Sequence, residues 1–113
     1  MNKDVTVYLR HIVDAIERMD GYLKGAGREG FLASDLLQAG VTREMEIIGE
    51  AAKQVGDGFR KTHPDIPWKK MAGMRDKLIH DYLGVDYDAV WDTIVRDLPD
   101  LKKKLKAILE IAG

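Results

Sequence analysis

The side chains best suited to chemistry lie together in one short stretch of this sequence, residues 74–82, which reads MRDKLIHDY. Arg75 carries a permanent charge on a planar fork of donors that matches phosphate oxygens. His80 can take up or release a proton near neutral pH. Such a pair could cleave RNA without a metal. The histidine would help to deprotonate a ribose 2′-hydroxyl, and the arginine would stabilise charge on the phosphorane-like transition state.

The spacing of this pair limits how it can act. At roughly 100° per residue, positions 75 and 80 of an ideal helix lie about 140° apart, so the two side chains do not share a face. Arg75 and Tyr82, seven residues apart, nearly do. Arg75 and His80 can therefore converge only if the helix bends or unwinds near Gly84, or if a second chain completes the site. The spacing predicts a site near a helix end or at a dimer seam.

The elements that must position these residues are predicted to be helices. Apolar residues recur at helical spacing over about 2–24, 34–61 and 67–82, and again from about residue 86. Pro99 either ends that fourth helix or starts a fifth. The loop at 25–30 breaks the first helix with three glycines, Gly40 is a possible kink in the second, and no segment is strand-like.

Short connections between helices favour antiparallel neighbours. We therefore expect an all-α fold, an antiparallel up-and-down bundle of four main helices plus a C-terminal helix. The residues expected in its core are Leu9, Ile12, Ile16, Met45, Ile48, Ala52, Val55, Leu78, Trp91 and Ile94.

The amino-acid composition excludes several classes of function. The chain of 113 residues has 18 basic and 19 acidic side chains, so RNA binding would need a local basic patch. The absence of cysteine excludes thiol chemistry. There is no glycine-rich phosphate loop, nucleophile elbow or zinc-binding HExxH motif, and the three histidines are scattered. We expect neither a cofactor nor a metal. No apolar run reaches the roughly 20 residues of a membrane span, which favours a soluble cytoplasmic protein.

Each candidate residue also has a purely structural interpretation. Taken alone, Arg75 is typical of a surface salt bridge, His80 of a helix cap and Tyr82 of an aromatic at the core edge. Glu50 is either a charge just outside the core or a partner that orients Arg75 or Lys77. The basic run on the last helix is typical of a solvated face; it comprises Lys102, Lys103, Lys104 and Lys106.

A family resemblance favours the functional interpretation of these residues over the structural one. The arrangement Arg75-Asp76-x-x-x-His80-x-Tyr82 resembles the R-x4-H-x-Y signature of HepT-like HEPN ribonuclease toxins. Further stretches resemble the family in order and spacing: IGEAA at 48–52, HPDIPW at 63–68, HDYLGVD at 80–86 and VW at 90–91. The resemblance covers nearly the whole chain and is strongest over 45–101.

The resemblance implies a single HEPN domain over residues 1–113 that forms a homodimer around a shared cleft. It implies metal-independent endoribonuclease activity, with Arg75 and His80 catalytic and Asp76 supporting them. It also implies a partner in a type II-like toxin–antitoxin system, a minimal nucleotidyltransferase antitoxin of the MntA kind. That antitoxin would transfer AMP from ATP to Tyr82, whose added negative charge would block the site. Whether toxin and antitoxin form a larger assembly stays open.

A second interpretation comes from another class of function. In it, the chain is a non-catalytic helical module whose cleft holds a nucleotide or docks the nucleotidyltransferase. Arg75 would then bind phosphate without turnover.

Overall fold

The computed structural model describes residues 3–73 and 84–112. Helices account for 84% of these residues, and no strand occurs among them. The helices are α1 (Lys3–Leu23), α2 (Gly27–Leu32), α3 (Asp35–Gln54), α4 (Asp57–Thr62), α6 (Tyr87–Arg96) and α7 (Leu98–Ala112). Residues 68–73 are helical as well. The expected all-α fold is confirmed.

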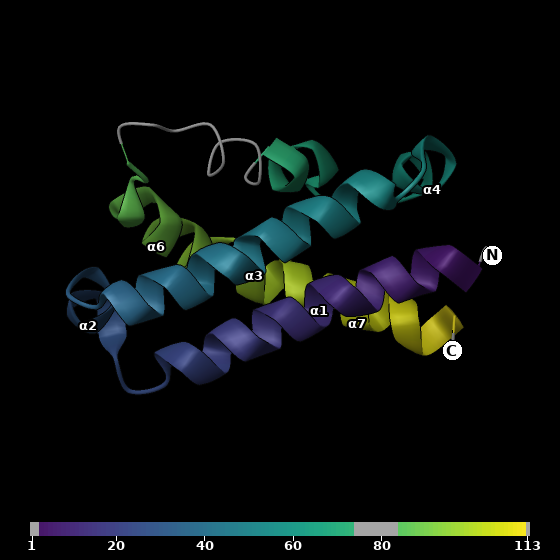
Figure 1. The fold of residues 1–113 in the computed structure, drawn as a ribbon. Coiled ribbons are helices and arrows are strands. Elements are labelled where there is room, and N and C mark those ends of the chain that lie inside the picture. Colours follow the sequence, from purple (N-terminus) through teal and green to yellow (C-terminus); the bar gives the residue numbers. More distant parts are fainter. Residues whose placement is uncertain (1–2, 74–83, 113) are drawn as a thin grey trace.

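Two long antiparallel helices form the centre of the bundle. In Figure 1, α1 runs from the end marked N towards α2, and α3 returns beside it towards α4. The C-terminal helix α7 packs along α1, while α6 packs on α7 and α2. The up-and-down arrangement therefore follows from short turns between helices that each have one apolar face. No helix in the described part of the chain is long and apolar enough to cross a membrane.

The core lies between these helices and is largely the predicted one. Eight of the predicted positions are buried: Leu9, Ile12, Ile16, Met45, Ile48, Ala52, Val55 and Ile94. Trp91 is only half-buried, and its ring stacks on the buried Phe31 with centroids 5.6 Å apart. Leu78 lies outside the described residues.

The predicted loop over residues 25–30 does break the first helix but is shorter than expected, because the turn covers residues 24–26 and a helix follows. Gly25 and Gly27 have φ values of 79° and 65°, a left-handed conformation that glycine adopts without steric cost. These two glycines turn the chain within a few residues, so helix α2 begins at Gly27 and places Phe31 in the core.

The predicted second helix over residues 34–61 is wrong at its end. It starts as expected, because the Ser34 hydroxyl accepts a hydrogen bond from the Leu37 amide at 3.1 Å. It ends at Gln54, where Val55 turns extended and a separate α4 follows. The Arg60 side chain stabilises this break by donating to the Val55 carbonyl at 2.9 Å. By contrast, α3 passes through Gly40 without a break.

The remaining helix boundaries within the described residues agree with those predicted from the sequence. Pro67 directly precedes the helical residues 68–73. Asp86 caps α6 by accepting from the Ala89 amide at 3.1 Å. Pro99 is the second residue of α7, so it belongs to the start of a new helix. The expected helix end at Tyr82 lies outside the described residues.

Candidate functional site

The motif residues singled out from the sequence lie outside the described residues. They are Arg75, Asp76, Lys77, His80 and Tyr82, and all lie in the stretch between residues 73 and 84. Their convergence on one site stays a prediction. The structure does describe the two ends from which this stretch is held.

The N-terminal end is anchored by an aromatic cluster. Trp68 is 5% exposed, and its indole N–H donates to the His63 carbonyl at 3.0 Å. Phe59 stacks on the His63 ring at 4.3 Å and meets Trp68 edge-on at 6.0 Å. One turn further on, Met71 is buried. The chain therefore enters the motif from a helix fixed on the core.

The C-terminal end is anchored just as firmly. Gly84 has a φ of 109°, which favours glycine. Asp86 then caps α6, the Tyr87 ring meets Phe31 edge-on at 5.9 Å, and Val90 is buried. Both ends of the motif stretch are thus attached to one hydrophobic core.

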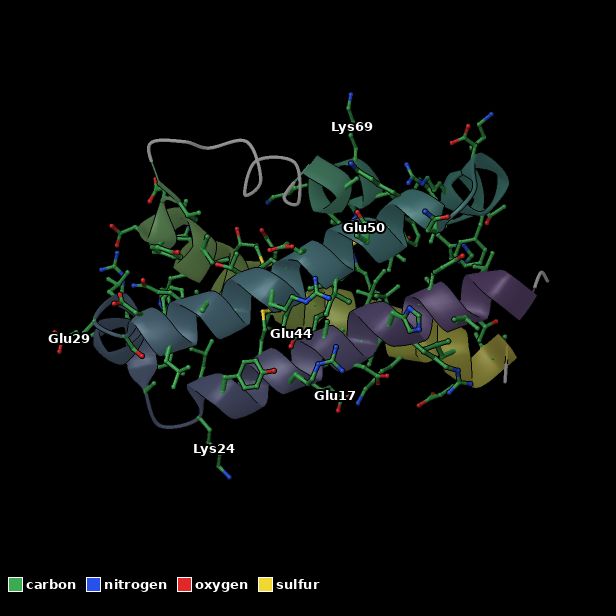
Figure 2. All side chains as sticks on the ribbon, viewed as in Figure 1. Glu17, Lys24, Glu29, Glu44, Glu50 and Lys69 are labelled. Carbon is green, nitrogen blue, oxygen red and sulfur yellow. The ribbon has the colours of Figure 1, made fainter. Side chains whose placement is uncertain are left out.

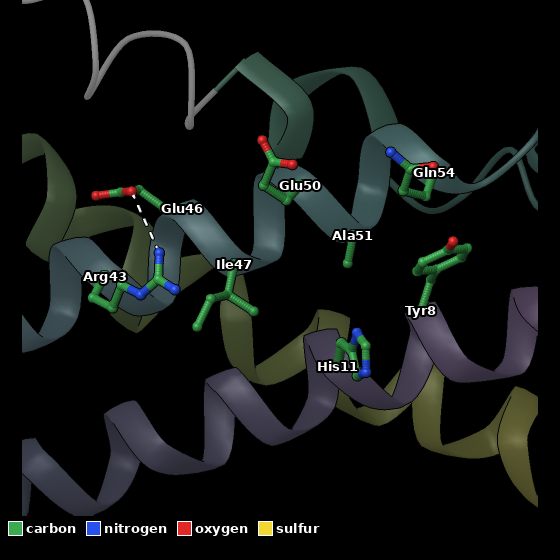
Figure 3. A pocket seen from close by; sticks show the side chains of 8 residues that line it. All are labelled: Tyr8, His11, Arg43, Glu46, Ile47, Glu50, Ala51 and Gln54. Atoms are coloured by element: carbon green, nitrogen blue, oxygen red, sulfur yellow. Dashed lines mark ion pairs between the residues drawn. The ribbon is translucent and has the colours of Figure 1, made fainter.

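Glu50 is the one predicted site residue that the structure describes. It is exposed on α3, and Figure 3 shows its carboxylate pointing away from α1. This position fits a charge just outside the core. Its orienting role towards Arg75 or Lys77 stays a prediction.

Sequence reasoning missed a groove beside Glu50. It has a volume of about 640 Å³ and runs between α1 and α3 (Figure 3). Its lining residues are Tyr8, His11, Arg43, Glu46, Ile47, Glu50, Ala51 and Gln54. The available signal was the spacing of Glu46, Glu50 and Gln54, which puts three hydrogen-bonding side chains on one face of a helix.

A buried carboxylate was also missed. Glu44 is 4% exposed and sits between α1 and α3 (Figure 2). One of its oxygens accepts from Arg18 Nε at 2.9 Å and the other from the Tyr22 hydroxyl at 2.8 Å. The hydrogen bond to Glu44, with desolvation as a smaller cause, raises the pKa of Tyr22 above its usual 10.0. This cluster ties the two central helices together.

The basic run on α7 contributes to packing between helices. Lys102 pairs with Asp20 at 2.9 Å, and Lys106 pairs with Glu17 at 3.6 Å, both on α1. Lys104 pairs within its own helix with Asp100 at 3.1 Å. These acidic partners neutralise much of the run. Lys103 and Lys106 are exposed, as a solvated face predicts, whereas Lys102 and Lys104 are half-buried. Within residues 3–73 and 84–112, no group of three potential ligands could hold a metal ion.

The helical bundle carries a polar motif between two core-anchored helices. The family described as Ribonuclease HepT-like matches residues 12–108, and the chain belongs to this family. The match spans the whole R-x4-H-x-Y stretch.

Similar curated proteins bear ribonuclease names. One from Thermococcus cleftensis, "Probable ribonuclease HepT", is 45% identical over 101 residues, which cover 89% of this chain and 92% of that protein. One from Caldanaerobacter subterraneus subsp. tengcongensis, named "Putative RNase", is 45% identical over 103 residues, 91% of this chain and 92% of that protein. No solved structure matches the chain significantly.

A third relative combines two activities in its name. The protein "Gamma-glutamylcyclotransferase and putative RNase" of Methanocaldococcus jannaschii is 44% identical over 110 residues. The matched region covers 97% of this chain and 50% of that protein.

Proposed function

We propose that the chain is a metal-independent endoribonuclease, the toxin of a toxin–antitoxin pair, acting on RNA in the cytoplasm as a single HEPN domain. The observation that carries this proposal is the family match over residues 12–108, which includes an intact R-x4-H-x-Y motif. The anchoring of both ends of this motif on one core supports it, because a catalytic stretch needs fixed geometry.

The chemistry follows from the residue types. His80 accepts the proton of a ribose 2′-hydroxyl, whose oxygen attacks the adjacent phosphorus. The bond to the 5′-oxygen breaks, and that oxygen leaves with a proton, so the products are a 2′,3′-cyclic phosphate and a 5′-hydroxyl. Arg75 binds the equatorial oxygens, where negative charge grows. Asp76 supports this pair, and Lys77 adds a second cation.

The catalytic pair is proposed to act in a composite site. Positions 75 and 80 lie about 140° apart on an ideal helix, so they converge either if the helix unwinds near Gly84 or if a second chain completes the site. We favour the second arrangement, in which the mate's motif completes the cleft of a homodimer. Glu50, exposed on α3, would orient Arg75 or Lys77 by ion pairing. Light scattering should therefore show a dimer at micromolar concentration. An active monomer would contradict the composite site.

The ribonuclease proposal is tested with purified protein and single-stranded RNA in excess EDTA. We expect cleavage by the wild type and its loss in His80→Ala and in Arg75→Ala. His63→Phe keeps the stack on Phe59 and serves as the matched histidine control, while Arg28→Ala removes a surface arginine. Both controls should stay active. Absence of cleavage by the wild type, or full activity of His80→Ala, would favour a non-catalytic binding module.

Regulation is proposed to act on Tyr82. A nucleotidyltransferase antitoxin would direct the phenol oxygen to the α-phosphorus of ATP, forming a Tyr–AMP phosphodiester and releasing pyrophosphate. The new negative charge would occupy the phosphate site and pair with Arg75. After co-expression, mass spectrometry should find one AMP on wild-type Tyr82 and none on Tyr82→Phe. Tyr87→Phe is the neighbouring control. Equal neutralisation of Tyr82→Phe and wild type would contradict this role.

A further inference from the structure

Positive charge is concentrated in the part of the chain that leads into the motif. Residues 53–70 contain five basic and two acidic side chains, which leaves 13 basic and 17 acidic side chains elsewhere. This part comprises the end of α3, α4 and the start of the helical residues 68–73, and Figure 1 shows these segments together at one end of α3. In a chain that is otherwise acidic on balance, a polyanion would be attracted to this end.

Two lysines of this region project from a common base. Lys61 is on α4, two residues after Phe59, and Lys69 directly follows Trp68. The rings of Phe59 and Trp68 meet edge to face with centroids 6.0 Å apart, so the two elements are packed together. Both lysines are exposed, and Figure 2 shows Lys69 extending away from the bundle. The aromatic contact therefore holds two solvent-facing cations on one end of the molecule.

The charges of these two lysines are not cancelled by nearby carboxylates. Within residues 3–73 and 84–112, neither Lys61 nor Lys69 forms an ion pair. Asp65, which lies between them in the sequence, is 3.8 Å from Lys104 of α7. Asp57 is the other acidic residue of this region and stands in the first turn of α4. The two lysines thus differ from the basic run on α7, most of which faces acidic partners.

Arg60 adds a cation that the fold itself holds in place. Its side chain donates to the Val55 carbonyl at 2.9 Å and also to the Ala52 carbonyl. These acceptors carry no formal charge, so they fix the guanidinium without forming an ion pair. A guanidinium has five N–H donors, and those not used here can donate to a phosphate oxygen.

We propose that Arg60, Lys61 and Lys69 form an RNA-binding surface, the α4 surface, which holds the phosphate backbone of the strand beside the cleavage site. The biological role of this surface rests on the proposed ribonuclease function. Lys69 precedes Arg75 by six residues, so at most about 20 Å of extended chain separates them. A strand bound on the α4 surface is therefore within a few nucleotides of the motif. Contacts to phosphate carry no sequence information, so the surface positions RNA without selecting a base.

Binding to an RNA that cannot be cleaved tests the surface apart from catalysis. The probe is a fluorescent single strand of about 12 nucleotides with 2′-O-methyl groups, which lacks the nucleophile of the proposed reaction. Each phosphate contact to a single strand contributes about 0.7 to the slope of log affinity against log salt concentration. Lys61→Gln/Lys69→Gln should lower this slope by about 1.4, which corresponds to about 25-fold weaker binding at about 0.1 M salt.

The matched control is Lys24→Gln/Lys103→Gln, which removes the same charge from two exposed lysines. Lys24 lies on the opposite side of the bundle from Lys69 in Figure 2. This control should keep the wild-type slope, and probes made only of cytosine or only of uracil should give the same result. Equal losses in the two double variants, or an unchanged slope in Lys61→Gln/Lys69→Gln, would overturn the proposal. Unchanged RNA binding with loss of a protein partner would also overturn it.

The length of the substrate tests the link to the active site. Lys61→Gln/Lys69→Gln should raise KM far more for an RNA of about 12 nucleotides than for a dinucleotide, which is too short to reach both places. An equal rise for both substrates would show that the lysines act at the reacting phosphate, and the proposal would be wrong. If the wild type cleaves no RNA but binds the methylated strand with the expected slopes, the ribonuclease function fails while the α4 surface stands.

Discussion

Replacing Arg18 with Met tests how the two central helices are tied together. The carboxylate of Glu44 is almost fully buried and receives one hydrogen bond from Arg18 and one from Tyr22, at 2.9 and 2.8 Å. Met keeps an apolar stem that can cover the same surface but removes the guanidinium. The variant therefore leaves a buried charge with one donor fewer, at nearly unchanged shape.

The expected loss of stability depends on how far the Arg18 side chain is exposed to water. Removing one partner of a fully buried ion pair costs about 3–5 kcal/mol. The Arg18 side chain is 45% exposed, so water can reach the vacated position and replace part of the lost interaction. We expect Arg18→Met to lower the free energy of unfolding by about 2 kcal/mol. The control is Arg28→Met, because Arg28 and Asp88 are 53% and 63% exposed. It should cost less than about 0.5 kcal/mol.

The free energy of unfolding of both variants is measured by urea denaturation, monitored by circular dichroism. The slope of the transition should stay constant, so that the shift in midpoint reports stability alone. In the double variant Arg18→Met/Glu44→Gln, a neutral amide oxygen can still accept from Tyr22, and stability should rise above that of Arg18→Met. Equal losses in Arg18→Met and Arg28→Met, or a double variant less stable than Arg18→Met, would refute the reasoning.

Three further predictions concern the same pair of helices. Because the pKa of Tyr22 is raised above 10.0 in the folded protein, its contribution to stability is present below pH 10.0 and is lost as the pH rises through the folded pKa. An ultraviolet titration of wild type minus Tyr22→Phe should show a midpoint above 10.0, and a lower one would contradict the hydrogen bond to Glu44. Gly40→Ala should give no net stabilisation despite the helix-propensity gain of about 1 kcal/mol, because the added Cβ would lie 3.3 Å from two Tyr22 ring carbons. In a Tyr22→Leu background this gain in stability should return, as measured by thermal unfolding. Ser34→Ala should cost about 1 kcal/mol of unfolding free energy through loss of the α3 cap, and an unchanged urea midpoint would count against that cap.

The sequence predicted the helices well because each has one apolar stripe. Ser34 and Asp86 were recognisable starts, since their short polar side chains can bond the free amides of a first turn. The break after Gln54 was not predictable in the same way. The apolar stripe continues through Val55 to Phe59, and the long-reaching bond from Arg60 to the Val55 carbonyl leaves no periodic signal.

The candidate site, too, could be predicted from the sequence only in part. The motif residues lie within one short stretch, so the sequence alone shows the family signature, while their arrangement in space stays a prediction. The α1–α3 groove needs the register between two helices, which a single-sequence pattern does not contain. Glu44 shows this most clearly. Its burial depends on Arg18 and Tyr22, which lie 26 and 22 residues away in the chain.

The packing of α7 against α1 has a consequence for how the protein is made. Lys102 reaches Asp20 across 82 positions of sequence, and Leu105 is fully buried in the shared core. During synthesis α1 leaves the ribosome long before α7, so α1 and α3 can pair while the surface meant for α7 is still open. A nascent chain therefore keeps an uncovered apolar strip until α7 emerges, and chaperones have that interval in which to bind it. Completion of the fold, and with it any activity that needs the finished bundle, waits for the final residues of α7.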